Sequence, residues 1–240
     1  MAGTIPDSVI IKCSAVRYTN GGKEQIEDPV AVETEVMLFL NGQLSISLPA
    51  SADSLAEFGA GFFTAAGLAG KIHSVEVRGC SVYVEAEPAE HAGEETLLVS
   101  DSAAGNVLVT PDEIKDMSAA LDTDLWQETG GLHTAALYYQ HVKAAVFSDI
   151  ARRNAAEKAV GYMVLHDLTP KDCILVSTGR QPQDMVEIAA RAGIPVVISR
   201  AAATASGIAA ADKQGITLVC FARGGRFTVY AHPERVIFSE

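Results

Sequence analysis

The second half of the chain repeats one pattern, in which short apolar runs each end in an arginine-bearing turn, with helix-forming stretches between runs. The runs "AAVF", "CILV", "PVVI" and "TLVCF" end at Phe147, Val176, Ile198 and Phe221. Apolar runs that alternate with helical stretches predict strands of a largely parallel sheet with helices packed on its faces. The pattern therefore predicts an α/β fold for this half.

Polar residues follow each of these four runs. The carboxyl ends of parallel strands meet at one edge of a sheet, which is where ligands bind in open α/β folds. Eight of the ten arginines lie in residues 121–240, and arginine suits bidentate recognition of phosphate or carboxylate. The candidate ligand residues at this edge are Asp149, Arg152, Ser177, Gly179, Arg180, Ser199, Arg200, Thr204, Ala222, Arg223, Gly224, Gly225 and Arg226.

Two of these arginines stand where a helix is expected to begin. Arg152 and Arg153 face the positive end of the helix macrodipole, which costs a few tenths of a kcal/mol each, and a bound anion would reverse that sign. Asp149, at the predicted N-cap, is placed to orient an arginine or to accept from a purine or ribose. The alternative is that Asp149 only caps the helix and both arginines point to water. Four arginine-bearing turns at one edge favour a polyanionic ligand.

The stretch "TGGLH" precedes the first strand of this half. Thr129, Gly130 and Gly131 predict a turn with positive φ, where a ligand can approach the backbone. His133 would then donate to that ligand or move a proton. The alternative is a plain turn followed by a histidine with protein partners, and this stretch alone favours that alternative.

The first half is β-rich. Asn41-Gly42 predicts one hairpin, and a second turns near Arg78-Gly79. Between them, residues 51–70 have helical apolar spacing. A helix over 110–126 opens on a capping box at Thr110. The predicted organisation is a β-rich domain with one helix over 1–98, a loop or linker over 99–110, and an α/β domain over 111–240.

Charge and hydropathy exclude several classes of partner. The net charge of −12 argues against nucleic-acid and anionic-membrane surfaces. No apolar run reaches the roughly 18–20 residues of a transmembrane helix, and the N-terminus has no signal-type apolar core. We therefore expect a cytoplasmic protein with no nucleic-acid and no membrane partner.

The four cysteines are Cys13, Cys80, Cys173 and Cys220, and no two have C-x-x-C spacing. That spread excludes a disulfide framework and a cysteine-rich zinc site, so no metal site is predicted. P-loop, G-x-S-x-G, G-x-G-x-x-G and zinc-deaminase motifs are also missing.

Six segments occur in the order found in one known family. "TGGLHTAAL", "DIARRNAAEKAVG", "VSTGR", "SRAAAT", "GITLVCFARGGRFTVY" and "HPERV" resemble the formate dehydrogenase accessory sulfurtransferase family (FdhD-type). The resemblance extends over residues 27–238. It implies a cytidine-deaminase-like α/β domain joined to a smaller β-rich N-terminal domain, in a homodimer.

The resemblance also implies a function. Members of that family receive persulfide sulfur from a cysteine desulfurase and pass it to the molybdenum or tungsten bis(molybdopterin guanine dinucleotide) cofactor of formate dehydrogenase. GDP would mimic one arm of this cofactor. The family's cofactor-contact segment matches Phe221 to Arg226. The family positions kept here include Asp149, Arg152, Asn154, Lys158, Gly179, Arg180, Thr204, Arg223 and Arg226.

One departure bears on the sulfur chemistry. The family pattern S-C-G-x-C-G corresponds to "SDSAAG", which puts Asp101 and Ala104 at the two cysteine positions. A carboxylate cannot carry a persulfide. Among the other cysteines, Cys80 beside a hairpin turn is expected to be the most exposed thiol and Cys13 the next candidate. Three hypotheses stay open: a cofactor-binding chaperone without sulfur transfer, a sulfurtransferase with a relocated cysteine, and a nucleotide sensor unrelated to molybdenum.

Overall fold

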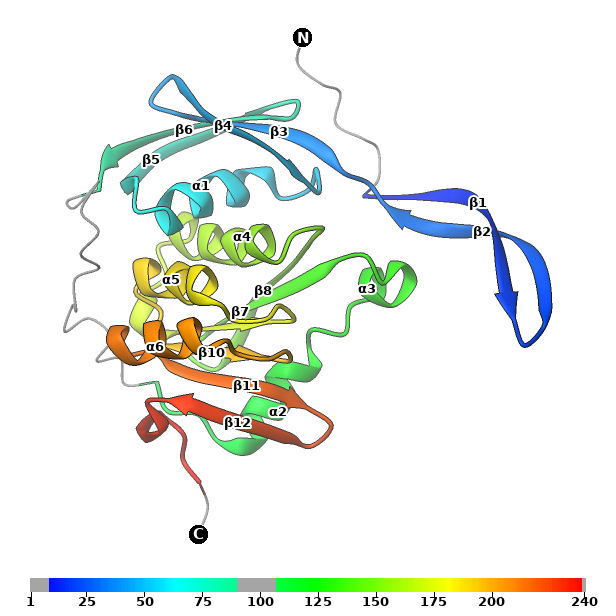
Figure 1. Cartoon of the computed structure of the whole chain (residues 1–240). Helices are drawn as coiled ribbons and strands as arrows, with labels where there is room; N and C mark the ends of the chain where they lie inside the picture. Colours follow the sequence, from blue (N-terminus) through cyan, green and yellow to red (C-terminus); the bar gives the residue numbers. More distant parts are fainter. Residues whose placement is uncertain (1–8, 90–106, 239–240) are drawn as a thin grey trace.

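A mixed six-stranded sheet forms the centre of the molecule, in the order β12-β11-β10-β9-β7-β8 (Figure 1). The structure, a computed structural model, describes residues 9–89 and 107–238. Parallel strands β9, β10 and β11 are joined by helices, as the apolar runs predict. The strands are β7 (His133–Tyr139), β8 (Val142–Asp149), β9 (Cys173–Ser177), β10 (Val196–Ser199), β11 (Thr217–Arg223) and β12 (Arg226–Ala231).

The prediction of a largely parallel sheet is wrong for half of the strands. Strands β7, β8 and β12 run antiparallel to a neighbour. Two-residue turns cause this, because they can join only antiparallel strands. Gln140 and His141 link β7 to β8 with φ of 48° and 66°, and Gly224-Gly225 links β11 to β12 with φ of 61° and 77°.

Helices cover both faces of this sheet, and apolar clusters fill the space between. One face packs on α4 (Arg152–Leu165), α5 (Gln183–Ala192) and α6 (Ala205–Gln214), and the other on α2 (Pro111–Ala119). The capping box at Thr110 is confirmed, but the expected single helix over 110–126 is two. Thr123 caps a separate α3 (Asp124–Thr129). Two 3-10 turns are Pro170–Asp172 and Pro233–Arg235.

The first half forms a second, four-stranded sheet in the order β4-β3-β6-β5. Both predicted hairpins and the helix between them are confirmed. Helix α1 (Leu55–Ala65) covers one face around Phe58 and Phe63. The strands are β3 (Thr34–Leu40), β4 (Gln43–Ala50), β5 (Ala69–Arg78) and β6 (Ser81–Pro88).

Helices α1 and α4 join the two halves at a glycine crossing. A Cβ on Gly61 would lie 1.7 Å from the carbonyl oxygen of Glu157, and one on Gly161 would lie 1.8 Å from that of Glu57. Backbones can approach this closely only without side chains between them. The molecule is therefore layered as sheet, α1, the α4–α5–α6 layer, the central sheet and α2 (Figure 1).

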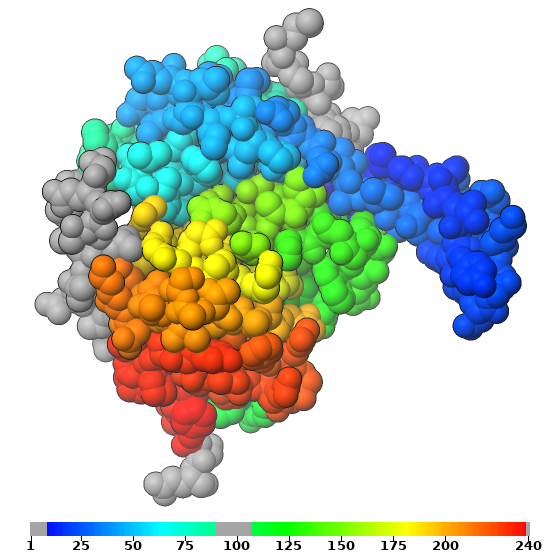
Figure 2. Space-filling model, viewed as in Figure 1, coloured from blue at the N-terminus to red at the C-terminus, as the bar shows by residue number. Residues whose placement is uncertain are grey.

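Strands β1 (Ile10–Thr19) and β2 (Gly22–Ala31) form a two-stranded arm that projects from the body (Figure 2). Its apolar side chains Ile11, Val16 and Tyr18 are exposed. The base of the arm lies against α3, where Ala31 neighbours Gly131.

The structure corrects the expected exposure of Cys80. Its side chain is buried where the β5–β6 turn enters β6, a central strand of its sheet. Cys173 and Cys220 are buried, and Cys13 on the arm is partly exposed. Asp101, Ala104 and the predicted domain boundary near 98 lie outside the described residues. Within residues 9–89 and 107–238, no helix is long and apolar enough to cross a bilayer.

Candidate functional site

The predicted ligand edge exists as one continuous feature, which we call the rim: residues 129–133, 150–152, 177–180, 199–204 and 221–226. His133, the first residue of β7, pairs with Asp149 at the end of β8. Ser177 at the end of β9 pairs with Ser199 at the end of β10. Because β10 and β11 are also parallel, Arg223 ends its strand on the same side.

One hollow on the rim, the Trp126 cavity, has a volume of about 290 Å³. It brings together predicted site residues Gly130, Gly131, His133, Arg200 and Arg223. Gly130 ends α3 with a φ of 59°, so the predicted positive-φ turn is confirmed. The remaining wall consists of Trp126, Leu132, Thr178 and Ala201. An aromatic ring and two guanidinium groups in one hollow suit a base and a phosphate.

A second hollow of about 270 Å³, the Asp122 cavity, adjoins the first. Arg200 and Arg223 line both, so these two side chains divide the rim into neighbouring compartments. The rest of its wall is Ala222, Gly224, Gly225 and Arg226 of the β11–β12 turn, Phe227, and Ile114, Lys115, Ser118, Ala119 and Asp122 of α2 and its end.

Several rim arginines lack carboxylate partners. Within the described residues, Arg180, Arg223 and Arg226 form no ion pair, whereas Arg200 pairs with Asp122. The Nε atom of Arg152 is buried and has no hydrogen-bond partner among residues 9–89 and 107–238. Its side chain lies against Gly179, where a Cβ would come within 2.8 Å of the Cβ of Arg152. The rim therefore holds guanidinium groups that are free to bind an anion.

The pKa of His133 depends on the charged groups around it. Its Nδ1 lies 3.3 Å from the hydroxyl of Thr178. Burial lowers the pKa of His133 below its ordinary value, and the positive charges of Arg152 and Arg180 lower it further. A bound anion would offset these charges and favour the imidazolium form.

Arg153 differs from its neighbour Arg152. Its guanidinium binds the buried carboxylate of Glu157 at 2.9 Å and that of Asp184 at 3.3 Å. The expectation that both arginines either hold an anion or point to water is therefore wrong for Arg153, which stabilises the start of α4. The pKa of Glu157 is raised above its ordinary value, because the effect of burial exceeds the opposing effect of the Arg153 charge.

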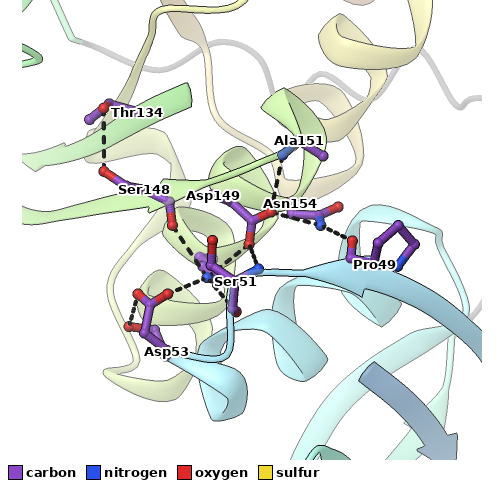
Figure 3. A network of polar contacts seen from close by, with 10 residues as sticks. Pro49, Ser51, Asp53, Thr134, Ser148, Asp149, Ala151 and Asn154 are labelled. Atoms are coloured by element: carbon purple, nitrogen blue, oxygen red, sulfur yellow. Dashed lines mark hydrogen bonds and ion pairs between the residues drawn. The ribbon is translucent and has the colours of Figure 1, made fainter. Parts of the chain in front are cut away.

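Three predicted ligand residues instead form a buried polar joint between the two halves (Figure 3). Asp149 and Lys158 are fully buried and their charged groups lie 2.9 Å apart. The Lys158 ammonium also lies 3.2 Å from the carboxylate of Asp53 and donates to the carbonyl oxygen of Ser51. We call Asp149, Asn154 and Lys158, with Ser51 and Asp53, the joint.

Asn154 and Ser51 make three further hydrogen bonds in the joint. Asn154 Nδ2 donates to Asp149 at 3.0 Å and to the carbonyl of Pro49 at 3.0 Å (Figure 3). The Ser51 N–H donates to the other oxygen of Asp149. The helix cap is Ala151 rather than Asp149, whose carboxylate accepts the Ala151 N–H. These side chains are enclosed by protein groups and do not line either cavity.

The remaining predicted residues shape the rim from behind. Ser177 accepts the Gly179 N–H, and the Ser199 hydroxyl donates to the Gly179 carbonyl. Thr204 caps α6. Phe221 packs into the core with a φ of 55°, and the Thr129 hydroxyl donates to Leu125. They hold the backbone in place and do not line the two cavities.

The sequence prediction missed Trp126, Lys115, Ser118 and Asp122. All four lie on α2, α3 or the bend between them. The capping box located α2 but not the face of the sheet that it covers. The missed signal is Thr123-Asp124, a second cap whose bend turns Asp122 and Trp126 toward the rim.

A family model described as the FdhD/NarQ family matches residues 78–237, more than half of the chain. The chain belongs to the FdhD/NarQ family. Among FdhD/NarQ relatives, a protein of Methanothermobacter thermautotrophicus named sulfur carrier protein FdhD is 29% identical, covering 90% of this chain and 94% of that protein. One of the same name from Wolinella succinogenes is 35% identical, covering 88% and 83%.

A solved structure has the same fold. The crystal structure of a putative formate dehydrogenase accessory protein from Desulfotalea psychrophila matches with a TM-score of 0.82 and 28% identity, covering 96% of this chain and all of that one. The predicted family and the α/β class are thereby confirmed. The cytidine-deaminase-like description stays a prediction.

Proposed function

We propose that this protein is a formate dehydrogenase accessory protein that binds the molybdenum or tungsten bis(molybdopterin guanine dinucleotide) cofactor as cargo along the rim. Membership of the FdhD/NarQ family supports the accessory role. The observation that carries the cargo proposal is the set of rim arginines without carboxylate partners. Guanidinium groups of this kind suit pyrophosphates.

The shape of the rim supports a cargo with two nucleotide arms. Arg200 and Arg223 separate two hollows of about 270 and 290 Å³. Each is close to the lower end of ligand-pocket volumes, roughly 300 Å³, so each suits one nucleotide arm rather than the entire cofactor. The orphaned Arg152 Nε adds a donor that a ligand can satisfy.

The state of the cysteines favours the alternative function, a binding chaperone or sensor without sulfur transfer. The positions that correspond to the family's cysteines are Asp101 and Ala104. Burial raises the pKa of Cys173 and of Cys220 to about 12, which keeps both thiols protonated. Cys80 is buried as well, so Cys13 on the arm is the only cysteine with partial exposure.

The cargo proposal is tested by calorimetry with GDP. Arg226→Ala should weaken GDP binding by about 10- to 100-fold, since a hydrogen bond to a charged group contributes about 1.5–3 kcal/mol. Arg17→Ala, which removes an exposed arginine of the arm paired with Asp28, is the matched control and should leave the affinity unchanged. Equal affinities for the Arg226 and Arg17 variants would reject the rim as the site.

The sulfur question needs a separate experiment. The protein is incubated with a cysteine desulfurase and cysteine, and bound sulfur is then located by mass spectrometry. Sulfur on Cys13, lost in Cys13→Ser, would support a sulfur carrier with a relocated thiol. An unmodified protein that still binds GDP would support the chaperone or sensor. Co-elution with formate dehydrogenase and sedimentation test the proposed client and homodimer.

A further inference from the structure

We propose that Asp122 selects the base of the bound nucleotide by accepting hydrogen bonds from the N1–H and the 2-amino group of a guanine. This inference rests on the proposed function, because it takes a nucleotide on the rim as given. It adds the residue that distinguishes guanine from other purines and the hollow in which the base lies.

Asp122 is the only acidic residue that lines the Asp122 cavity. Lys115, Arg200, Arg223 and Arg226 line the same hollow, so an isolated negative charge stands among four positive ones. Phosphate would be repelled by this carboxylate and attracted to the arginines. The wall is therefore divided between a region for phosphate and a point suited to a group that donates hydrogen bonds.

The acceptor at that point is available. One oxygen of Asp122, Oδ1, is bound by Nη1 of Arg200, and Oδ2 has no partner among the described residues. Ser118, the only hydroxyl side chain of the same wall, is already committed, because it donates to the carbonyl of Ala222. Asp122 is thus the side chain of this wall that can receive one donor of a ligand on Oδ2, and a second on Oδ1 once Arg200 turns away.

The purine edges differ in what they offer to a carboxylate. Guanine presents two adjacent donors, N1–H and the 2-amino group. Adenine has an acceptor at N1 and no 2-amino group. Xanthine has a donor at N1 but an acceptor at position 2. A carboxylate fits the guanine edge alone, whereas the amide of an asparagine, with one acceptor and one donor, fits xanthine.

Arg200 connects base selection to phosphate binding. It pairs with Asp122 and lines both cavities. When a guanine occupies both carboxylate oxygens, Arg200 loses this partner and its guanidinium turns to the phosphate. Binding thereby exchanges the Asp122–Arg200 ion pair for two contacts with the ligand, one between Asp122 and the base and one between Arg200 and the phosphate. In the free protein, each of these two charged groups has the other as its partner.

Asp149 does not compete for this role. Its carboxylate is fully buried and takes part in the joint with Lys158 and Asn154. The earlier expectation that Asp149 accepts from a purine or ribose is therefore reassigned to Asp122, which the sequence prediction did not include.

The test measures the affinities of GDP, ADP and xanthosine diphosphate (XDP) by calorimetry for the full chain and for Asp122→Asn. Wild-type protein should bind GDP about 10- to 100-fold more tightly than XDP or ADP, the discrimination expected of one bidentate pair of about 1–3 kcal/mol. Asp122→Asn should weaken GDP by a similar factor and strengthen XDP, so that the preference reverses.

Arg200→Ala is the matched control. It should weaken all three nucleotides, because it acts on phosphate, and should keep the preference for GDP, because the Asp122 carboxylate remains. If Asp122→Asn also weakens all three equally, Asp122 only positions Arg200, and the inference is overturned while nucleotide binding stands. An unchanged GDP affinity in Asp122→Asn overturns it too. If wild-type protein binds none of the three, the proposed function itself fails.

Discussion

The rim and the joint are built from the same kinds of residue, yet they have opposite surroundings. They meet at the carboxyl end of β8 and the start of α4, where Arg152 of the rim is two residues from Asn154 of the joint. In the joint, Lys158 and Asp149 are fully buried, and the main-chain N–H and carbonyl of Ser51 bind Asp149 and Lys158 respectively. On the rim, Arg152 keeps a buried Nε without a partner, and Arg223 and Arg226 are exposed.

The difference shows how a neighbouring domain decides the role of a charged residue. A buried ion pair contributes little net stability, but removing one partner is costly. The joint therefore fixes how the two halves fit together, and its charged groups are paired within the protein and not available to a ligand. Rim charges that the protein leaves unsatisfied are those it offers to a ligand.

Removing Lys158 should have the largest effect. Lys158→Met leaves the Asp149 carboxylate buried without its cation and should lower the free energy of unfolding by about 3–5 kcal/mol, measured in urea. Arg226→Ala, the rim control, should change it by less than about 0.5 kcal/mol. The double variant Lys158→Met with Asp149→Leu should recover much of the loss. If Lys158→Met stays as stable as Arg226→Ala but loses GDP binding, Lys158 belongs to the site.

Arg152 and Arg153 provide the closest matched pair. Arg152→Ala should weaken GDP binding by about tenfold or more, because a charged donor is lost, and should leave stability unchanged. Arg153→Ala leaves Glu157 without its cation, so it should lower the free energy of unfolding by about 1–3 kcal/mol and leave GDP affinity unchanged. Calorimetry measures the GDP affinity of both variants, and urea unfolding measures their stability. Identical results for the two variants would contradict the assignment of Arg152 to ligand binding and of Arg153 to stability.

His133 should show the smallest effect. Its pKa in the free protein lies below 6.5, because burial, Arg152 and Arg180 disfavour the cation. GDP should raise this pKa, which NMR titration detects. Binding then takes up protons, so affinity rises as pH falls through the interval between the free and bound pKa values, by less than about tenfold. His133→Gln should abolish that pH dependence. A pKa that GDP leaves unmoved would place the anion away from this end of the rim.

The same histidine gives a sign for stability. A depressed native pKa means that the unfolded chain binds the proton more readily. The contribution of His133 is therefore fully present above its ordinary pKa of 6.5 and diminishes as pH falls below that value.

The rim could be predicted from sequence because strand direction alone determines it. Once β9, β10 and β11 are joined by helices, their last residues must lie at one edge. Arg223 ends β11 and Arg226 begins β12 after a two-residue turn, so their location needs no knowledge of other segments.

The joint could not be predicted in the same way. Asn154 and Lys158 are four residues apart and share a face of α4, but the burial of that face depends on α1 and residues 49–53, which come from the other half of the chain. Asp122 was missed for a similar reason, since its placement depends on a helix bend at Thr123 and on Arg200, which follows β10.

The glycine crossing of α1 and α4 limits how this molecule can move. With backbone against backbone at Gly61 and Gly161, the two sheets have no side-chain layer on which to slide. We therefore expect the two halves to move together as one rigid body, without a domain closure over the bound cofactor. Another molecule would have to cover the guanine arms. We therefore expect the cofactor to be delivered in a direct complex, in which this protein and the recipient enclose the cofactor between them.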